Sequence, residues 1–129
     1  MTLNLDSVTF DCADVMRVAR FWADALGWKL DPESEPDGAR VVRDPSRRSD
    51  GLYFQPVPEP KVVKNRLHLD LRATGSMAAE VERLEGLGAT VAGRVDEEGS
   101  YWTVMQDPEG NELCVLRGPE DGWPGYAEA

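Results

Sequence analysis

The 129-residue sequence predicts an α+β fold built from two tandem βαβββ modules, whose strands form a curved mixed sheet around a cavity with the helices outside. Each half of the chain carries one segment with the helical spacing of apolar residues and four short segments with strand patterns. The order strand, helix, three strands therefore occurs twice. We expect one domain over residues 1–129, with modules at 1–57 and 65–117 and a C-terminal tail at 118–129.

The first module opens with an alternating segment at 3–11, LNLDSVTFD, which is typical of a half-buried strand. Asp14 can then cap a helix whose apolar residues recur at helical spacing, and Gly27 is the expected stop. Three short strands follow between turn-rich segments, at 28–31, 39–44 and 51–57.

The second module follows a linker, PEPKVVKN, and opens with the alternating segment RLHLDLR at 66–72. Thr74 or Ser76 can cap its helix, and Gly88 is the expected stop. Three further strands are expected at 89–95, 101–106 and 111–116. The tail has no periodic pattern, so we expect an irregular segment whose large aromatics, Trp123 and Tyr126, dock on folded protein.

Composition excludes several classes of partner. The formal net charge of −10 and the dispersed basic residues are unfavourable for binding nucleic acid or an anionic lipid surface. No apolar stretch is long enough to cross a membrane, and the first residues lack the pattern of a secretion signal. A soluble protein of the reducing cytoplasm is the expectation, with Cys12 and Cys114 as free thiols.

Strand parity predicts which side chains share a face. Leu67, Leu69 and Leu71 are expected to pack under the second helix, which leaves His68 and Asp70 on the opposite, polar face. Arg66 and Arg72 of the same strand share that face, and the other strands add Ser7, Thr9, Asp11, Tyr53, Gln55, Glu112, Cys114 and Leu116 to the polar faces. If the sheets curl, these faces line one hollow. The charged members are either solvated rim groups or groups that orient a ligand, and Trp102 is either core or pocket wall.

Four segments resemble the vicinal oxygen chelate superfamily, and within it the glyoxalase-like domains related to glyoxalase I, bleomycin-resistance proteins and extradiol dioxygenases. They are SVTFDCADVMRVARFWADALGW, NRLHLDLRA, EVERLEGLGATV and DPEGNELCVL. The resemblance covers nearly all of residues 3–117. It implies the paired-module fold described above and a homodimer.

The resemblance also implies where a metal would bind. The family's ligand positions fall at Ser7, Gln55, His68 and Cys114, where its metalloenzymes usually have His, Glu or Gln, His and Glu. Only His68 is a full match, and serine is a poor ligand. We therefore predict no resident metal and no cofactor, and an extradiol dioxygenase is disfavoured because its two-His-one-carboxylate set is absent.

Two functions remain open. In the first, the protein binds and sequesters a small molecule, and its acidic surface favours a cationic ligand. In the second, it is a lyase or isomerase in which His68, with Asp70 or Glu112 nearby, moves a proton on a small oxygenated substrate. Binding is the preferred interpretation, and Cys114 is read as an inert packing residue. The candidate ligand-binding residues are Ser7, Thr9, Tyr53, Gln55, His68, Asp70, Trp102, Glu112 and Cys114.

Overall fold

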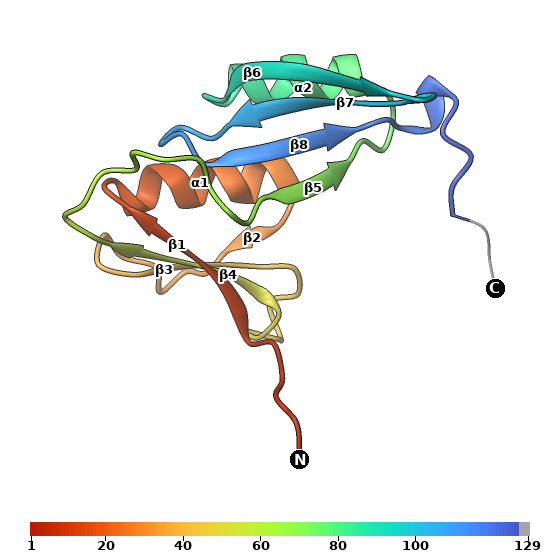
Figure 1. Ribbon diagram of the computed structural model, residues 1–129. Coiled ribbons are helices and arrows are strands. Elements are labelled where there is room, and N and C mark those ends of the chain that lie inside the picture. The colour runs from red at the N-terminus through yellow and green to blue at the C-terminus, as the bar shows by residue number, and fades with distance from the viewer. Residues whose placement is uncertain (127–129) are drawn as a thin grey trace. The chain divides into compact units, whose positions relative to one another are not determined.

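A computed structural model describes residues 1–126 of the chain, which divides into two compact units at residues 62 and 63 (Figure 1). Within residues 1–126, each unit contains one α-helix and one four-stranded mixed sheet. The predicted α+β class and the repeated βαβββ order are confirmed. Among the described residues, no helix is both long and apolar enough to span a membrane.

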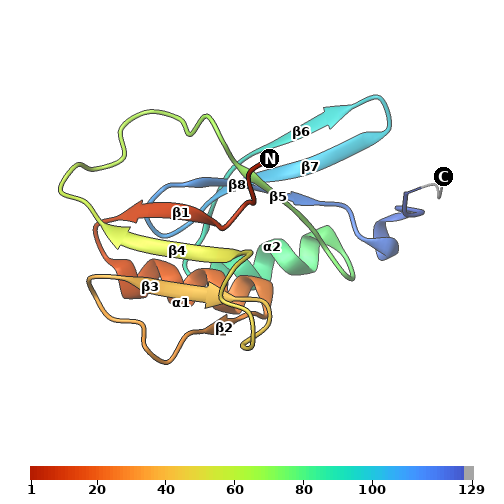
Figure 2. The same cartoon turned by 90° about the horizontal axis from the view of Figure 1, so that it is seen from below.

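The N-terminal unit contains one sheet covered on one face by a helix (Figure 2). Its strand order is β1-β4-β3-β2, with β1 and β4 parallel and the other pairs antiparallel. Its elements are β1 (Ser7–Cys12), α1 (Val15–Leu26), β2 (Lys29–Leu30), β3 (Ala39–Val42) and β4 (Gly51–Pro56).

Helix α1 begins and ends where the sequence predicts. The Asp14 carboxylate accepts a hydrogen bond from the Arg17 backbone N–H at 3.3 Å, and Gly27 ends the helix with φ of 67°. Trp22 and Phe54 are completely buried, and Phe10 packs against both, with ring centroids 5.1 and 5.0 Å away. This aromatic cluster joins the helix to the sheet.

The C-terminal unit repeats the topology with strand order β5-β8-β7-β6. Its elements are β5 (Leu69–Arg72), α2 (Met77–Gly86), β6 (Thr90–Glu97), β7 (Ser100–Gln106), β8 (Glu112–Leu116) and the 3-10 turn η1 (Pro119–Asp121). Ser76, and not Thr74, caps α2 by accepting the Ala79 backbone N–H at 3.2 Å. Gly88, with φ of 113°, lies just past the helix end at Gly86.

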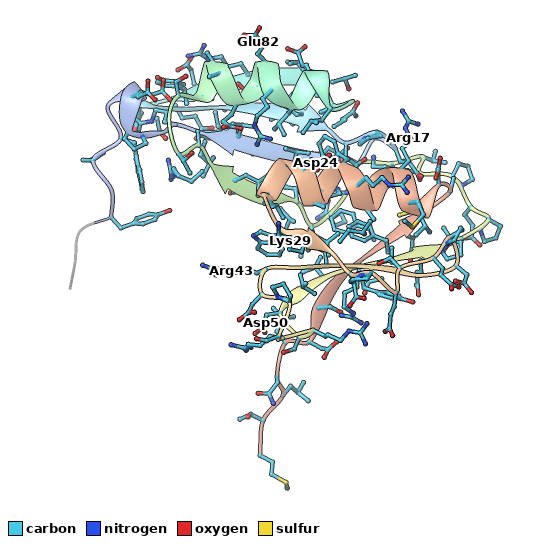
Figure 3. The ribbon with its side chains drawn as sticks, turned by 180° about the vertical axis from the view of Figure 1, so that it is seen from behind. Arg17, Asp24, Lys29, Arg43, Asp50 and Glu82 are labelled. Atoms are coloured by element: carbon cyan, nitrogen blue, oxygen red, sulfur yellow. The ribbon has the colours of Figure 1, made fainter. Side chains whose placement is uncertain are left out.

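Charged side chains occupy the helix faces turned away from the sheets. Arg17 and Asp24 lie on α1 and Glu82 lies on α2, and all three are exposed (Figure 3). The apolar residues of each helix lie on the opposite side, as amphipathic spacing requires.

Two predicted strands start three or four residues later than the sequence pattern suggested. The first begins at Ser7, not Leu3, and Leu3 and Leu5 are exposed. The opening strand of the second module begins at Leu69, and Leu67 is 67% exposed, so its predicted packing under the helix was wrong. The reason lies in the partner strand: β5 pairs with β8, which begins only at Glu112. Residues before Leu69 therefore have almost no neighbouring strand with which to form backbone hydrogen bonds.

In each module an Asp-Pro turn connects the two strands of the last hairpin, and the aspartates of the two turns differ in burial. Asp107 is 3% exposed, and its carboxylate accepts the backbone N–H groups of Glu109 and Asn111, both at 2.9 Å. Asp44 occupies the corresponding place in the first module, but it is exposed, and its carboxylate accepts hydrogen bonds from the Ser46 backbone and side chain. The DPEGN segment is therefore structural, as predicted from its residues.

The tail contacts its own unit through Trp123, as predicted, whereas Tyr126, which was also expected to dock, is 78% exposed. The Arg72 guanidinium stacks 3.9 Å from the Trp123 ring centroid, and Trp123 meets Tyr126 edge to face. The Asp121 carboxylate accepts backbone N–H groups from Gly118 at 2.9 Å and from Met77, at the start of α2, at 2.7 Å. Residues 127–129 of the predicted tail lie outside the described residues.

Candidate functional site

A hollow of about 350 Å³ lies on the polar face of the C-terminal sheet. We call it the C-terminal hollow, and it is lined by Lys64, His68, Asp70, Arg72, Ser100, Tyr101, Trp102, Val104, Glu112, Cys114 and Leu116. The opposite face of the same strands carries the buried Met105, Leu113 and Val115. The parity argument is therefore confirmed for this sheet, and Trp102 is a wall of the hollow.

Three side chains converge at the floor of the hollow. Asp70 on β5 pairs in register with Cys114 on β8, and His68 lies two residues before Asp70 on the same face. The His68 Nδ1 is 3.2 Å from the Asp70 Oδ1 and 3.9 Å from the Cys114 Sγ. The side chains of His68 and Asp70 are 40% and 54% exposed, whereas Cys114 is buried.

The environment of Cys114 keeps its thiol protonated. Burial, followed by the charge and hydrogen bonding of Asp70, raises the pKa of Cys114 to about 11. Asp70 and Cys114 both approach the same histidine nitrogen, whereas a nucleophile-base-acid triad uses the two ring nitrogens separately. The three residues do not form an activated thiol site, which agrees with the sequence interpretation of Cys114 as unreactive.

Two rings and an arginine, Tyr101, Trp102 and Arg72, are among the lining residues of the hollow. The guanidinium carbons of Arg94 and Arg117 are 4.5 and 5.4 Å from the Tyr101 ring centroid. Arg72 donates to the Arg117 carbonyl oxygen at 3.0 Å besides stacking on Trp123 of the tail. Its guanidinium is therefore held by protein groups at the rim.

Glu112 has a structural partner at the entrance to β5. Its carboxylate accepts the Asn65 backbone N–H at 3.0 Å, and the Asn65 side chain also donates to Asn111 at 3.3 Å. These contacts tie the segment before His68 to the end of the last hairpin.

The remaining predicted residues belong to the N-terminal sheet. Ser7 pairs in register with Gly51, and Thr9 pairs with Tyr53. Gln55 pairs with Asp11 and donates to its carboxylate at 3.0 Å. Ser7 and Gln55 are therefore four positions apart along the paired strands, on the order of 13 Å, and the sheet does not bring them together.

Several lining residues were absent from the sequence-based list of ligand-binding candidates: Lys64, Arg72, Ser100, Tyr101, Val104 and Leu116. Parity had placed Arg72 and Leu116 on this face, and it offered the same signal for Val104, which is two residues from Trp102. No local pattern identifies Lys64, because it lies in the linker before β5.

The model of a family described as "Glyoxalase-like domain" matches residues 7–116. The chain therefore belongs to the glyoxalase-like domain family, as the sequence resemblance predicted. No curated protein sequence matches it.

Solved structures with the same fold are distant in sequence. A glyoxalase/bleomycin resistance protein/dioxygenase family enzyme from Burkholderia phytofirmans PsJN is 17% identical with a TM-score of 0.68, over 88% of this chain and 97% of that one. A mutant form of the fosfomycin resistance protein FosX from Listeria monocytogenes, complexed with Mn(II) and 1S,2S-dihydroxypropylphosphonic acid, is 11% identical with a TM-score of 0.72, over 92% of each chain.

A third structure is the bleomycin-binding protein from Streptomyces verticillus, complexed with copper(II)-bleomycin. It is 22% identical to this chain, with a TM-score of 0.57 over 92% of this chain and 99% of that one. Enzymes and a drug-binding protein thus share this fold, so the reaction or ligand has to be argued from the site.

The residues at the four positions that the resemblance implies as metal ligands are not the family's usual donors. Serine is a poor ligand, and Gln55 bonds Asp11 and is not adjacent to Ser7 in the sheet. His68 and Cys114 do lie together, and the third group beside them is Asp70. The donors present therefore differ from the family's set in both identity and position.

Proposed function

We propose that the protein binds a small molecule in the C-terminal hollow, without the four-residue metal centre of its family. The observation that supports this most directly is the hollow itself, whose volume of about 350 Å³ falls in the range of small-molecule sites. Its lining combines an aromatic wall with a few polar groups, which is the usual composition of such sites.

The partners of the charged groups indicate the ligand's chemistry. Arg72 is held by Trp123 and the Arg117 carbonyl, and Glu112 holds the Asn65 backbone. Asp70 is about half exposed in the hollow beside the Cys114 thiol and the His68 imidazole, and Lys64 lines the same hollow. These contacts favour a ligand whose cationic or hydrogen-bond-donating group binds Asp70 and whose flat apolar part packs on Trp102.

A thermal-shift screen of reduced, chelator-treated protein tests this proposal. The panel contains cationic drugs, α-keto acids and thiol conjugates. We expect a saturable rise in melting temperature with a cationic ring compound. Asp70→Asn and Trp102→Ala should each reduce the shift, whereas Glu82→Gln, on the outer face of α2, should leave it unchanged. Equal shifts in all variants would overturn the proposed site.

The second candidate function is proton transfer by a lyase or isomerase, and the contact between His68 and Asp70 favours it. A carboxylate that accepts a hydrogen bond from Nδ1 fixes the tautomer in which Nε2 is a base. Turnover of small oxygenated substrates that is lost in His68→Ala, and falls in Asp70→Asn, would support this function. Tight one-to-one binding without turnover supports sequestration instead.

We also propose a homodimer in a reducing compartment such as the cytoplasm. Val62 and Val63 are 84% and 76% exposed, and each sheet leaves two edge strands, which are features that a second chain can cover. Cys12 and Cys114 are both in the thiol form, which suits a reducing compartment. Light scattering at micromolar concentration tests the assembly, and a mass near 14.3 kDa would contradict it.

A further inference from the structure

We propose that His68, Asp70 and Cys114 bind one divalent metal ion, with zinc as the best match, entirely within the C-terminal unit. This site differs from the family's set because Asp70 supplies a donor and neither Ser7 nor Gln55 takes part. The inference goes beyond the proposed function: the ligand screen uses chelator-treated protein, in which Asp70 faces the ligand, whereas here Asp70 binds the metal.

The distances between the donor atoms carry the inference. One nitrogen, one carboxylate oxygen and one sulfur lie within 4.8 Å of one another, with Nδ1 to Oδ1 at 3.2 Å and Nδ1 to Sγ at 3.9 Å. Tetrahedral zinc with bonds of about 2.0–2.3 Å separates its ligand atoms by roughly 3.3–3.7 Å. Small side-chain rotations therefore suffice to close the three donors around an ion.

The backbone fixes these donors before any ion binds. Asp70 and Cys114 are direct partners in the parallel ladder of β5 and β8, so both side chains leave the same face at the same level. His68 is two residues before Asp70, and the Glu112 contact with the Asn65 backbone holds the segment leading to it. A site held in this way needs little reorganisation to bind a metal.

The donor types select the ion. Imidazole, thiolate and carboxylate are all zinc ligands, whereas magnesium and calcium require oxygen ligands throughout. Cys114 carries a proton in the metal-free protein, and binding of the ion releases this proton to solvent. Three protein ligands leave the fourth position of a tetrahedral ion open, and the donors line the hollow. That position can accept water or a donor atom from a bound molecule.

The convergence of two contacts on one nitrogen also favours a metal over a proton relay. Asp70 and Cys114 compete for the same Nδ1, which a relay through the ring does not require. A single ion in contact with all three donors satisfies each of them. The sequence-based prediction of a metal-free protein considered Ser7, Gln55, His68 and Cys114 as ligands and did not include Asp70.

Titration of the reduced, chelator-stripped full-length protein with Co²⁺ tests the site, since cobalt reports its ligands by absorption. We expect saturation at one ion per chain, with a thiolate-to-cobalt charge-transfer band and tetrahedral visible bands. Zn²⁺ should then displace the cobalt and remove the absorption. Cys114→Ser should abolish the charge-transfer band, and Asp70→Asn should weaken binding by at least about tenfold.

Two control variants match these changes outside the site. Cys12→Ser alters the other thiol, which is buried in the N-terminal unit, and Asp96→Asn alters an exposed acid of β6. Both should keep the band and the affinity. Circular dichroism confirms folding of each variant, and Cys114→Ala replaces Cys114→Ser if the latter unfolds.

Three results would overturn the inference. They are the absence of a saturable cobalt spectrum, a charge-transfer band that persists in both Cys114 variants, and binding that Asp96→Asn weakens as much as Asp70→Asn does. The last would indicate adventitious binding to the acidic surface. The titration uses only cobalt and zinc, so its outcome does not depend on the ligand screen. A failed titration would overturn the metal site and leave the proposed ligand site to be tested by the thermal-shift screen.

Discussion

The two modules share one topology but use it differently. The twelve-residue α1 has six buried residues, including the aromatic Trp22, whereas the ten-residue α2 has only two, Met77 and Leu84. On the polar face of the N-terminal sheet, Asp11 pairs with Gln55 and accepts a hydrogen bond from it. At the equivalent position of the C-terminal sheet, Asp70 pairs with Cys114. Thr9 occupies the position corresponding to His68.

This difference shows that the fold does not itself specify the site. Both parallel ladders present an aspartate and its partner on the polar face, at equivalent positions. The C-terminal module adds an imidazole and the indole wall of Trp102 there. The N-terminal module contributes a larger buried helix face, and the C-terminal module carries the candidate chemistry.

The largest expected effect separates these two roles. Trp22→Ala should destabilise the protein by about 3–5 kcal/mol, because it removes the centre of the N-terminal aromatic cluster. Trp102→Ala, in the C-terminal hollow, should cost less than about 1 kcal/mol and mainly impair ligand binding. Urea unfolding measures both, and an equal or larger loss for Trp102→Ala would contradict the division.

The second effect compares the Asp-Pro turns. Asp107→Ala should cost about 2–3 kcal/mol, because it leaves the backbone N–H groups of Glu109 and Asn111 without their acceptor. Asp44→Ala should cost clearly less, since Asp44 is exposed and water can replace it. Thermal unfolding of the two variants side by side tests this order, and equal shifts would count against it.

The third effect concerns the tail, which only the C-terminal unit has. Deletion of residues 118–129 should lower stability by about 1–2 kcal/mol, because it removes the Asp121 bond to Met77 and the Trp123 stack on Arg72. An unchanged melting temperature would show that these contacts contribute nothing measurable.

The same contacts predict a pH dependence. The backbone N–H groups of Gly118 and Met77 hold the pKa of Asp121 below its usual value. Since the folded pKa is lower than the unfolded one, the contribution of Asp121 is fully present above the ordinary carboxyl pKa and is lost as the pH falls through the lowered pKa. Asp121→Asn should therefore reduce the loss of stability on acidification; an unchanged pH profile would contradict this.

The smallest effect on stability is expected at the site. His68→Ala should change the free energy of unfolding by less than about 0.5 kcal/mol, because the side chain is 40% exposed. Ligand binding in the hollow should nevertheless be lost. A large stability loss with binding retained would make His68 a structural residue.

The sequence by itself determined the features that depend on neighbours a few residues apart. Asp14 and Gly27 bound the first helix as predicted, because capping is local. The alternation of strand residues placed His68, Asp70 and Cys114 on a polar face, because successive side chains point to opposite sides of any strand.

Only the tertiary structure decided which of those residues meet. The resemblance implies that Ser7 and Gln55 are both metal ligands, but the parallel register places Gln55 beside Asp11 and Cys114 beside Asp70. Strand pairing likewise fixed where β5 begins, and the contact with Arg72 fixed where the tail docks. Register is set by hydrogen bonds between segments far apart in the chain. Because side chains alternate along a strand, a shift of the pairing by two residues leaves the same side chains on each face, so the sequence pattern does not choose among such registers.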